Sequence, residues 1–297
     1  MNELSIIVLS YNTKDLTLKC LQTIFENKGS IKPEVWVVDN NSTDGSCEAI
    51  KKKYPQVSLI KSDKNLGFSG GNNLALKKIN SSYSLLLNSD TELLPGALDN
   101  LIESAGINDF AVASCKIINK DGSLQPNAGE LPSFFPMFIW LSGLDDIVRK
   151  IWPVNSYQSA DKSYYLGEKE VGWVSGSVML IRKDVFEDIG YLDEKIFMYG
   201  EDVEFCLRAK KAKFKIGWTE KAEIIHLGGG SSLSPRYNQW VGEFKGLLYI
   251  YNKYYGVLAA LMLKGLFYIF IAARAVSFLI LGRMNYAKTY AKIFINL

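Results

Sequence analysis

Short apolar runs alternate with amphipathic stretches along the first third of the chain. Four runs are rich in aliphatic and β-branched residues, which is typical of buried strands. They lie at residues 4–9, 35–38, 57–60 and 83–87. Between the first two runs, Leu16, Cys20 and Ile24 recur at helical spacing, and further helices are expected near residues 46–54 and from a glycine-rich turn toward residue 79. This alternation predicts an α/β fold with a mostly parallel sheet and helices on both faces.

After residue 90 the pattern is less regular. Residues 125–165 hold four prolines among aromatic residues, and we expect an irregular insertion there, a lid or an acceptor loop. The other expected elements are helices over residues 95–105 and 201–211, strands over 110–118, 171–181, 214–218 and 222–225, and a hairpin-type turn at Asp121-Gly122.

The last part of the chain is apolar and basic. Residues 257–281 carry only Lys264 and Arg274 as charged groups. The segment is long enough to cross a bilayer, for which about 20 apolar residues suffice. Its two cations and its aromatic residues favour a helix that lies in the membrane plane or re-enters it. Packing of these helices on the rest of the chain, or a dimer interface, is the alternative.

Charge is distributed unevenly along the chain. Residues 244–297 hold seven of the 34 basic residues and none of the 31 acidic ones, so residues 1–243 carry 27 basic and 31 acidic groups. An acidic body with a basic apolar tail argues against a nucleic-acid partner and suits an anionic membrane surface.

The cysteines and the N-terminus point to a reducing cytosol. The four cysteines are scattered without a Cys-x-x-Cys pair, which argues against a zinc site and a disulfide framework. They are Cys20, Cys47, Cys115 and Cys206. The first residues lack a basic region and an apolar stretch long enough for a signal peptide.

Polar clusters stand where the predicted strands end. They are Tyr11-Asn12, Asp39-Asn40-Asn41, Asn88-Ser89-Asp90 and the chain's one histidine, His226. Strand ends of such a sheet converge on one crevice, which is where α/β proteins bind ligands. A carboxylate with a neutral amide two residues before it suits a hard divalent ion that also carries phosphates, and a neutral imidazole can complete the pair.

Each cluster also has a purely structural interpretation. The residues from Asp39 to Asp44 and those around Asp90 are typical of turns and helix caps. A lone histidine is more often a satisfied structural residue than a ligand. Glu201-Asp202 stands at the start of a predicted helix, where acids are favourable, and one of the two is alternatively a general base.

Six stretches, taken together and in this order, resemble the family 2 glycosyltransferases with the GT-A fold, and especially their rhamnosyltransferase-like branch. The resemblance covers roughly residues 3–232. The stretches are SIIVLSYN (5–12), VVDNNSTDG (37–45), NLGFSGGNN (65–73), LLNSDT (86–91), WVSGS (173–177) and FMYGEDVE (197–204).

The resemblance implies a role for each cluster. The implied nucleotide-binding residues, with Asp39 on the pyrimidine base, are Ser10, Tyr11, Asn12, Asp39, Asn65, Gly67, Asn72 and Ser89. Asp90 matches the last acid of the Asp-x-Asp metal motif, His226 matches a late metal ligand, and Asn88 replaces the first acid. Mg²⁺ or Mn²⁺ is then held mainly by Asp90, His226 and the donor's diphosphate. Asp202 matches the catalytic base with Glu201 as its companion, and Trp173, Ser175 and Gly176 would face the sugar or the acceptor.

The resemblance therefore implies an inverting, metal-dependent glycosyltransferase. Its donor would be a nucleotide-diphosphate sugar, with dTDP-rhamnose favoured over UDP-sugars, and its acceptor a glycan or lipid-linked hydroxyl in bacterial cell-surface polysaccharide synthesis. Residues 1–236 would form the GT-A domain, with a nucleotide-sugar half to about residue 118 and an acceptor half from 119. Residues 237–297 would attach the protein to the cytoplasmic face of the inner or plasma membrane, or form a homo-oligomer. A sugar nucleotidyltransferase and a non-catalytic nucleotide-sugar-binding membrane protein are the alternatives.

Overall fold

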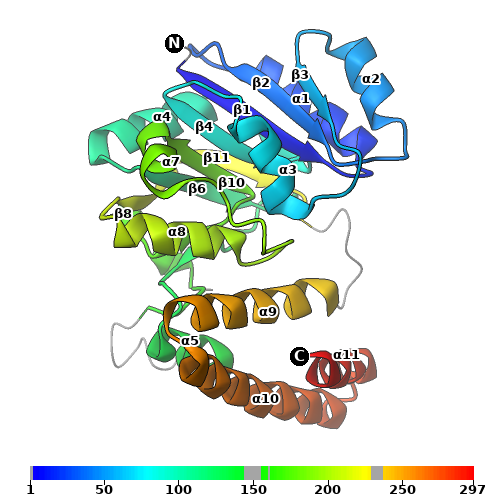
Figure 1. Cartoon of the computed structure of the whole chain (residues 1–297), viewed down its shortest axis with the longest axis vertical. Coiled ribbons are helices and arrows are strands. Elements are labelled where there is room, and N and C mark those ends of the chain that lie inside the picture. The colour runs from blue at the N-terminus through cyan, green and yellow to red at the C-terminus, as the bar shows by residue number, and fades with distance from the viewer. Residues whose placement is uncertain (1–2, 144–154, 160, 229–236) are drawn as a thin grey trace. The chain divides into compact units, whose positions relative to one another are not determined.

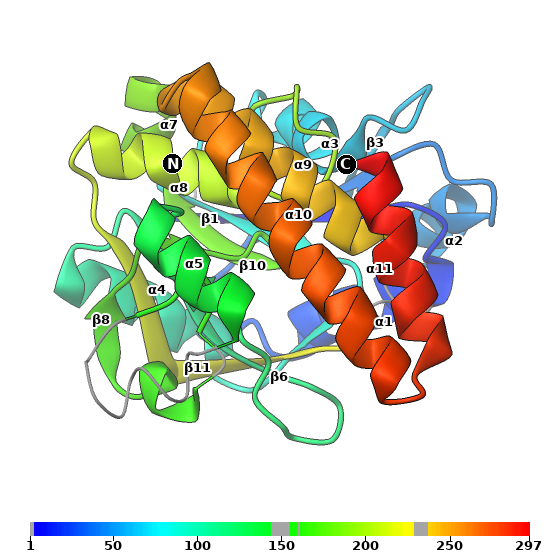
Figure 2. The same ribbon diagram turned by 90° about the horizontal axis from the view of Figure 1, so that it is seen from below.

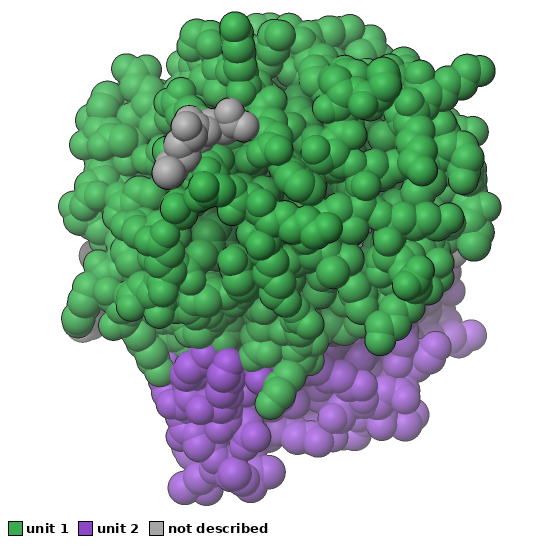
Figure 3. Space-filling model, turned by 45° about the horizontal axis from the view of Figure 1, so that its top comes forward, with its two compact units in different colours: residues 1–131, 158–197, 201–230 green, residues 132–157, 198–200, 231–297 purple. Residues whose placement is uncertain are grey.

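The computed structural model describes residues 3–143, 155–159, 161–228 and 237–297. The chain forms two compact units, shown in green and purple in Figure 3. The first consists of Met1–Leu131, Gln158–Phe197 and Glu201–Gly230. The second consists of Pro132–Tyr157, Met198–Gly200 and Ser231–Leu297. The expected domain boundary at residue 236 falls outside the described residues and stays a prediction.

The first unit is built on a sheet of nine strands within the described residues (Figure 1). The strands are Leu4–Ser10 (β1), Glu34–Asp39 (β2), Ser58–Lys61 (β3), Tyr83–Asn88 (β4), Thr91–Leu93 (β5), Val112–Ile118 (β6), Glu168–Glu170 (β8), Val178–Arg182 (β10) and Ile216–His226 (β11). Their order is β3-β2-β1-β4-β10-β6-β11-β5, with β8 paired to β11.

The direction of the strands changes across the sheet. Strands β3, β2, β1 and β4 are mutually parallel, and β6 is parallel to β11. Strand β10 is antiparallel to both β4 and β6, and β11 is antiparallel to β5 and β8. A short second sheet pairs Ala128–Gly129 (β7) with Trp173–Val174 (β9). The predicted α/β fold with a largely parallel central sheet is confirmed.

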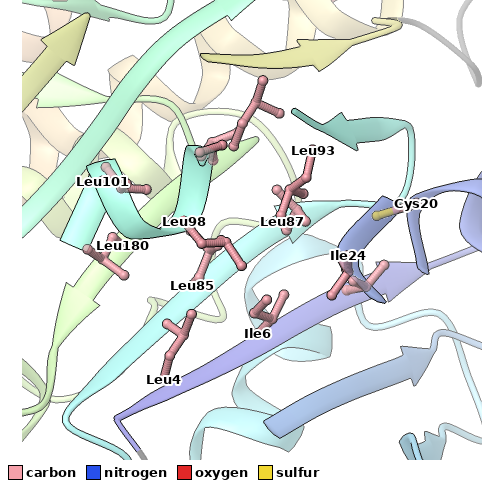
Figure 4. Packing of buried hydrophobic residues seen from close by; sticks show 14 of the residues in the cluster. Leu4, Ile6, Cys20, Ile24, Leu85, Leu87, Leu93, Leu98, Leu101 and Leu180 are labelled. Atoms are coloured by element: carbon pink, nitrogen blue, oxygen red, sulfur yellow. The ribbon is translucent and has the colours of Figure 1, made fainter. Parts of the chain in front are cut away.

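Helices cover both faces of the main sheet. They are Lys14–Glu26 (α1), Ser46–Lys53 (α2), Gly67–Leu76 (α3), Ala97–Asn108 (α4), Lys183–Ile189 (α7) and Glu201–Lys211 (α8), with a 3₁₀ turn at Lys162–Tyr165 (η1). Alternate strand residues point to opposite faces. On one face Leu4, Ile6 and Leu85 pack with α1 and α4 (Figure 4). On the other face Leu9 meets Gly71 of α3, where a Cβ would overlap the leucine side chain.

Two predicted strand patterns differ from the structure for local reasons. The stretches expected at residues 214–218 and 222–225 are one strand, β11, with a register shift between Thr219 and Glu223. The polar residues of this bulge suggested a break, although the strand continues on the same neighbour. Conversely, the strand expected over residues 171–181 is divided into β9 and β10 by the turn Ser175-Gly176-Ser177.

The insertion predicted at residues 125–165 is more regular than expected. It contains β7, η1 and the helix Phe134–Ser142 (α5). Helix α5 has an almost wholly apolar sequence and belongs to the second unit. Residues 144–154 and 160, with Pro153, lie outside the described residues.

The second unit is helical (Figure 2). Besides α5 it contains Tyr237–Tyr254 (α9), Val257–Ile280 (α10) and Met284–Asn296 (α11). The rings of Phe244 and Phe267 lie 4.6 Å apart between α9 and α10, and the Arg274 guanidinium donates to the Leu141 carbonyl at 3.0 Å. Burial is one-sided on α10, because Phe267 and Ile271 are buried whereas Ile269 is 65% exposed.

Gly242 and Gly246 on α9 lie against the loop Met198–Gly200 of the same unit. Tyr199 has φ 73° and Gly200 has φ 100°, so the chain turns through left-handed backbone at two successive residues. A Cβ at Gly246 would overlap the Tyr199 carbonyl oxygen, and one at Gly242 would overlap its ring. The two glycines therefore admit the loop to the helix surface.

Candidate functional site

The ends of three parallel strands lie side by side. The register pairs Ser10 with Asp39 and Leu9 with Asn88, and the Asn40 N–H donates to the Ser10 carbonyl at 2.8 Å. The polar residues that follow β1, β2 and β4 therefore share one edge of the sheet, as the sequence predicts.

Asp39 presents a buried carboxylate to this edge. Its Oδ2 accepts from the Ser42 N–H at 3.2 Å, whereas its Oδ1 has no hydrogen-bond partner within the described part of the chain. Burial, together with Asp39, raises the pKa of the neighbouring Cys47 thiol to about 11. A buried acceptor without a donor costs about 1–3 kcal/mol, so a ligand N–H at Oδ1 would be favourable.

The predicted residues Asn65 and Gly67 form a turn that is clamped by Asn40, which the sequence prediction did not single out. The Asn40 amide donates to Asn65 Oδ1 at 2.9 Å and to the Gly67 carbonyl at 3.0 Å, and it accepts from the Leu66 N–H at 2.9 Å. Gly67 has φ 70°, and a Cβ there would overlap Phe197. An amide that donates and accepts at once explains why Asn stands at position 40.

Several predicted nucleotide-binding side chains are engaged within the protein. The Ser10 hydroxyl is buried and hydrogen-bonds to Thr17 at 2.9 Å, and the Asn72 amide donates to the Phe68 carbonyl at 3.0 Å. Asn12 accepts from Thr43 N–H at 2.8 Å and so ties the β1 end to the turn after β2.

The Ser89 hydroxyl lies 3.0 Å from that of Thr13. Tyr11, by contrast, is 45% exposed beside the β1 end. Tyr11 and Asn12 are the two exposed residues of this set, and a bound nucleoside could reach them directly.

The predicted metal ligands do come together. Strand β11 pairs with β5 so that His226 stands opposite Thr91, and the Leu227 N–H donates to the Asp90 carbonyl at 2.9 Å. His226 Nε2 lies 3.1 Å from Asp90 Oδ1 and 3.3 Å from the Asn88 amide nitrogen. The Asp90 and His226 side chains are 14% and 13% exposed, so the pair is largely shielded from water.

The donor set fits a divalent ion that is shared with a substrate. One carboxylate, one imidazole and one amide are hard or borderline ligands. Within the described residues no cluster of three His, Cys, Asp or Glu side chains could hold a metal by itself. Mg²⁺ in particular is usually bound through one or two carboxylates plus substrate phosphates, which matches so small a set.

Asp202 is held by backbone donors at the start of α8. Its Oδ2 accepts from the Gly176 N–H at 3.0 Å, and its Oδ1 accepts from the Val203 N–H at 2.8 Å. Burial raises the pKa of the Asp202 carboxyl, and these two hydrogen bonds partly offset the effect. The other predicted acid, Glu201, is 5% exposed.

The turn between β9 and β10 bonds both the Asp202 carboxylate and the backbone at the end of β4. The Ser177 carbonyl accepts from the Asn88 N–H at 3.0 Å, while Gly176 bonds Asp202. The Ser175 and Ser177 hydroxyls lie 3.0 Å apart. The absence of a side chain at Gly176 leaves room for the Phe68 ring, which a Cβ would approach to 2.9 Å. The predicted sugar-facing residue Trp173 is 5% exposed in β9.

Two family models match the chain. The model of glycosyl transferase family 2 covers residues 5–190, and the model of glycosyl transferase family group 2 covers residues 155–296.

Curated relatives extend this match. N-acetylglucosaminyl-diphospho-decaprenol L-rhamnosyltransferase of Mycobacterium tuberculosis is 31% identical over 65% of this chain and 66% of its own length. Low-salt glycan biosynthesis hexosyltransferase Agl10 of Haloferax volcanii is 27% identical over 76% of this chain and 67% of its own length. Rhamnosyltransferase WbbL of Escherichia coli is 25% identical over 74% of this chain and 82% of its own length.

Solved structures share the fold. S. aureus TarS superposes with a TM-score of 0.53 at 18% identity, over 84% of this chain and 40% of TarS. TarS 1-349, solved in complex with UDP, superposes with a TM-score of 0.52 over 84% of this chain and 65% of the TarS fragment. The chain thus spans just under two thirds of the mycobacterial relative and less than half of TarS. The GT-A fold, the matched residues and the rhamnosyltransferases among its relatives agree, and the chain belongs to glycosyl transferase family 2.

Proposed function

We propose that this protein is an inverting glycosyltransferase of cell-surface polysaccharide synthesis. It would move a sugar from a nucleotide-diphosphate donor, dTDP-rhamnose in preference to a UDP-sugar, to a hydroxyl of a glycan or lipid-linked acceptor. The observation that carries the proposal is the arrangement around Ser175-Gly176-Ser177. One side of this turn bonds Asp202, and the other side bonds the strand end that bears Asn88.

Asp202 would act as the general base. Two backbone N–H groups fix its carboxylate, and burial raises its pKa toward the range in which a base works at neutral pH. The acceptor hydroxyl would lose its proton to Asp202 as its oxygen attacks the anomeric carbon and the nucleoside diphosphate leaves. A single displacement inverts the anomeric configuration. One carboxylate suffices because this leaving group needs no proton, unlike that of a glycosidase.

Asp90, His226 and Asn88 would hold Mg²⁺ or Mn²⁺ together with the donor's diphosphate. Such an ion would neutralise charge on the leaving phosphates. Asp39 would accept the N–H of a pyrimidine base at its Oδ1, and the exposed Tyr11 would flank the nucleoside. The names of the mycobacterial and Escherichia coli relatives support rhamnose as the transferred sugar.

The second unit would attach the protein to the anionic cytoplasmic face of the inner or plasma membrane. Helix α10 is the one helix in the described residues long and apolar enough to cross a membrane, by length and composition alone. Leu258 and Ile280 on it are 73% and 80% exposed, and Arg283 and Lys288 beyond it are exposed cations. Apolar surface beside basic groups supports binding to anionic lipid.

A donor panel tests the proposed reaction. Purified protein is incubated with Mn²⁺, a lipid-diphosphate sugar acceptor and each of several nucleotide sugars, and released nucleotide and glycosylated acceptor are measured by mass spectrometry. The proposal expects acceptor-dependent release, fastest with dTDP-rhamnose. Release of pyrophosphate from a sugar phosphate and a nucleoside triphosphate would instead identify a nucleotidyltransferase.

Vesicle flotation tests the proposed attachment. Leu258→Glu with Ile280→Glu is expected to abolish co-flotation with anionic phosphatidylglycerol vesicles, whereas Ile107→Glu, a 67% exposed position on α4, should leave it intact. Unchanged flotation of the double variant would contradict membrane attachment through α10. Loss of a dimer in light scattering without loss of flotation would assign the apolar face to self-association.

A further inference from the structure

Gln125 contacts the histidine of the candidate metal site. It follows the turn after β6, and its backbone N–H donates to the Ile117 carbonyl at 2.8 Å. Its side-chain Oε1 lies 2.5 Å from His226 Nδ1, on the opposite edge of the imidazole from Asp90. The two residues are 101 positions apart in the chain.

Neighbouring side chains fix which end of the Gln125 amide faces His226. The Gln125 Nε2 donates to Asn119 Oδ1 at 3.1 Å. The Asn119 amide nitrogen in turn donates to the Ser123 hydroxyl at 2.9 Å and to its carbonyl at 3.4 Å. The Ser123 hydroxyl itself donates to Asp121 Oδ1 at 2.6 Å. Reversing the Gln125 amide would place its NH₂ on an imidazole nitrogen and its oxygen on the Asn119 oxygen, which breaks this series of bonds.

The orientation of Gln125 determines the imidazole tautomer. An amide oxygen only accepts, so His226 Nδ1 carries the hydrogen. The lone pair of Nε2 then points toward the side where Asn88 and Asp90 lie, at 3.3 Å and 3.1 Å. An imidazole nitrogen and a carboxylate oxygen that face one another in this way are set to share a cation.

We propose that Gln125 is a positioning residue that holds His226 in its Nδ1–H tautomer, with Nε2 aimed into the Asp90 corner. The turn Asn119–Ser123 holds the Gln125 amide in this orientation through the hydrogen bond from Gln125 to Asn119. The proposal deepens the function proposed above and rests on it for its metal, although the tautomer itself does not depend on metal. Metal-binding histidines commonly donate their other ring N–H to an oxygen, and loss of that partner typically costs about 10–100-fold in metal affinity.

Because His226 is the chain's one histidine, the tautomer can be read without assignment. Tag-free, ¹⁵N-labelled full-length protein without metal is measured by long-range ¹H–¹⁵N correlation at about pH 8, where an ordinary imidazole is neutral. The Nδ1–H pattern is expected for the wild type and for Gln125→Glu, which keeps an accepting oxygen. Gln125→Leu should give a mixture. A wild-type Nε2–H pattern, or a Gln125→Leu spectrum identical to wild type, would overturn the proposal.

Metal binding supplies the second readout. Bound Mn²⁺ is titrated by electron paramagnetic resonance with UDP present. Gln125→Leu is expected to weaken Mn²⁺ binding about 10–100-fold, while Gln125→Glu and the control Gln22→Leu, whose amide makes a surface hydrogen bond to Glu26, stay close to wild type. If wild type and Gln125→Leu bind Mn²⁺ equally, Gln125 has no positioning role and the metal proposal survives. If the wild type binds none while its tautomer is Nδ1–H, the metal proposal fails and the tautomer assignment stands.

Discussion

The two units use apolar and polar residues in opposite ways. The first encloses its aliphatic side chains between the sheet and helices on both faces, and it places carboxylates and amides at the strand ends. The second packs one side of α10 on its own helices and leaves large apolar side chains such as Leu258, Ile269 and Ile280 exposed. The first unit therefore has a closed apolar core, whereas the outer face of α10 is the kind of apolar surface that marks an interaction site.

The chain passes between the units next to the proposed base. Residues Met198–Gly200 belong to the second unit and Glu201 to the first. The left-handed backbone of Tyr199 and Gly200 thus ends two residues before Asp202 in the sequence. If this division holds, substitutions in the two units should affect catalysis and stability separately.

The largest effect is expected at Asp202. Asp202→Asn should lower transfer by about 100–10,000-fold, because the acceptor proton loses its general base, while donor binding is kept. The raised pKa of this carboxyl also gives a sign: transfer should fall as pH drops through that pKa, since the protonated acid accepts no proton. Steady-state rates across pH check both, with Asp188→Asn on the exposed face of α7 as control. Normal transfer by Asp202→Asn would show that Asp202 is not the general base.

The next effect is on the stability of the first unit. Glu204 is fully buried and pairs with Arg208 at 2.9 Å, one helical turn away. Glu204→Ala leaves a largely buried guanidinium without its carboxylate and should lower the free energy of unfolding by about 3–5 kcal/mol. Lys183–Glu187 has the same spacing at the surface, so Glu187→Ala should cost less than about 1 kcal/mol. Urea denaturation measures both losses. If the two variants lose the same free energy of unfolding, the Glu204–Arg208 pair is not buried in solution.

The two sides of α10 provide the third test. Ile271 is 1% exposed, and Ile271→Ala should cost about 2–5 kcal/mol through lost burial and a cavity. Ile269→Ala, at a 65% exposed position, should change stability by no more than about 0.5 kcal/mol in aqueous buffer. Thermal unfolding of the two variants compares the faces directly. A large cost at Ile269 without lipid would mean that protein covers the outer face.

The smallest effect is expected where the loop meets α9. Gly246→Ala adds a methyl group against the Tyr199 carbonyl and should cost about 1–3 kcal/mol. At Gly265, on α10, an added Cβ would meet nothing within 4 Å, so Gly265→Ala should instead stabilise by up to about 1 kcal/mol. If both alanines stabilise the protein in calorimetry, the loop is not held by the glycine pair.

Local signals explain how much of this could be predicted. Strands β1 to β4 were foreseen because a strand buried on both faces is a continuous apolar run. The position of Asp90 beside His226 followed from the rule that strand ends converge. The roles of Asn40 and Gln125 were not foreseen, because each depends on an amide partner 25 or 101 residues away. The β11 bulge was missed because its exposed polar residues resemble a loop.

The antiparallel placement of β10 has a consequence for how such a protein can diversify. Strand β6 ends at Ile118 and β10 begins at Val178, and the two strands pair directly. Because the two strands are antiparallel, β6 ends and β10 begins on the same side of the sheet, and of the chain between them only β8 adds a strand to this sheet within the described residues. Each doubling of such a loop adds only about 0.6 kcal/mol of closure entropy. Segments of different length could therefore be exchanged between β7 and β8, while Gln125 and the turn Ser175–Ser177 on either side stay unchanged.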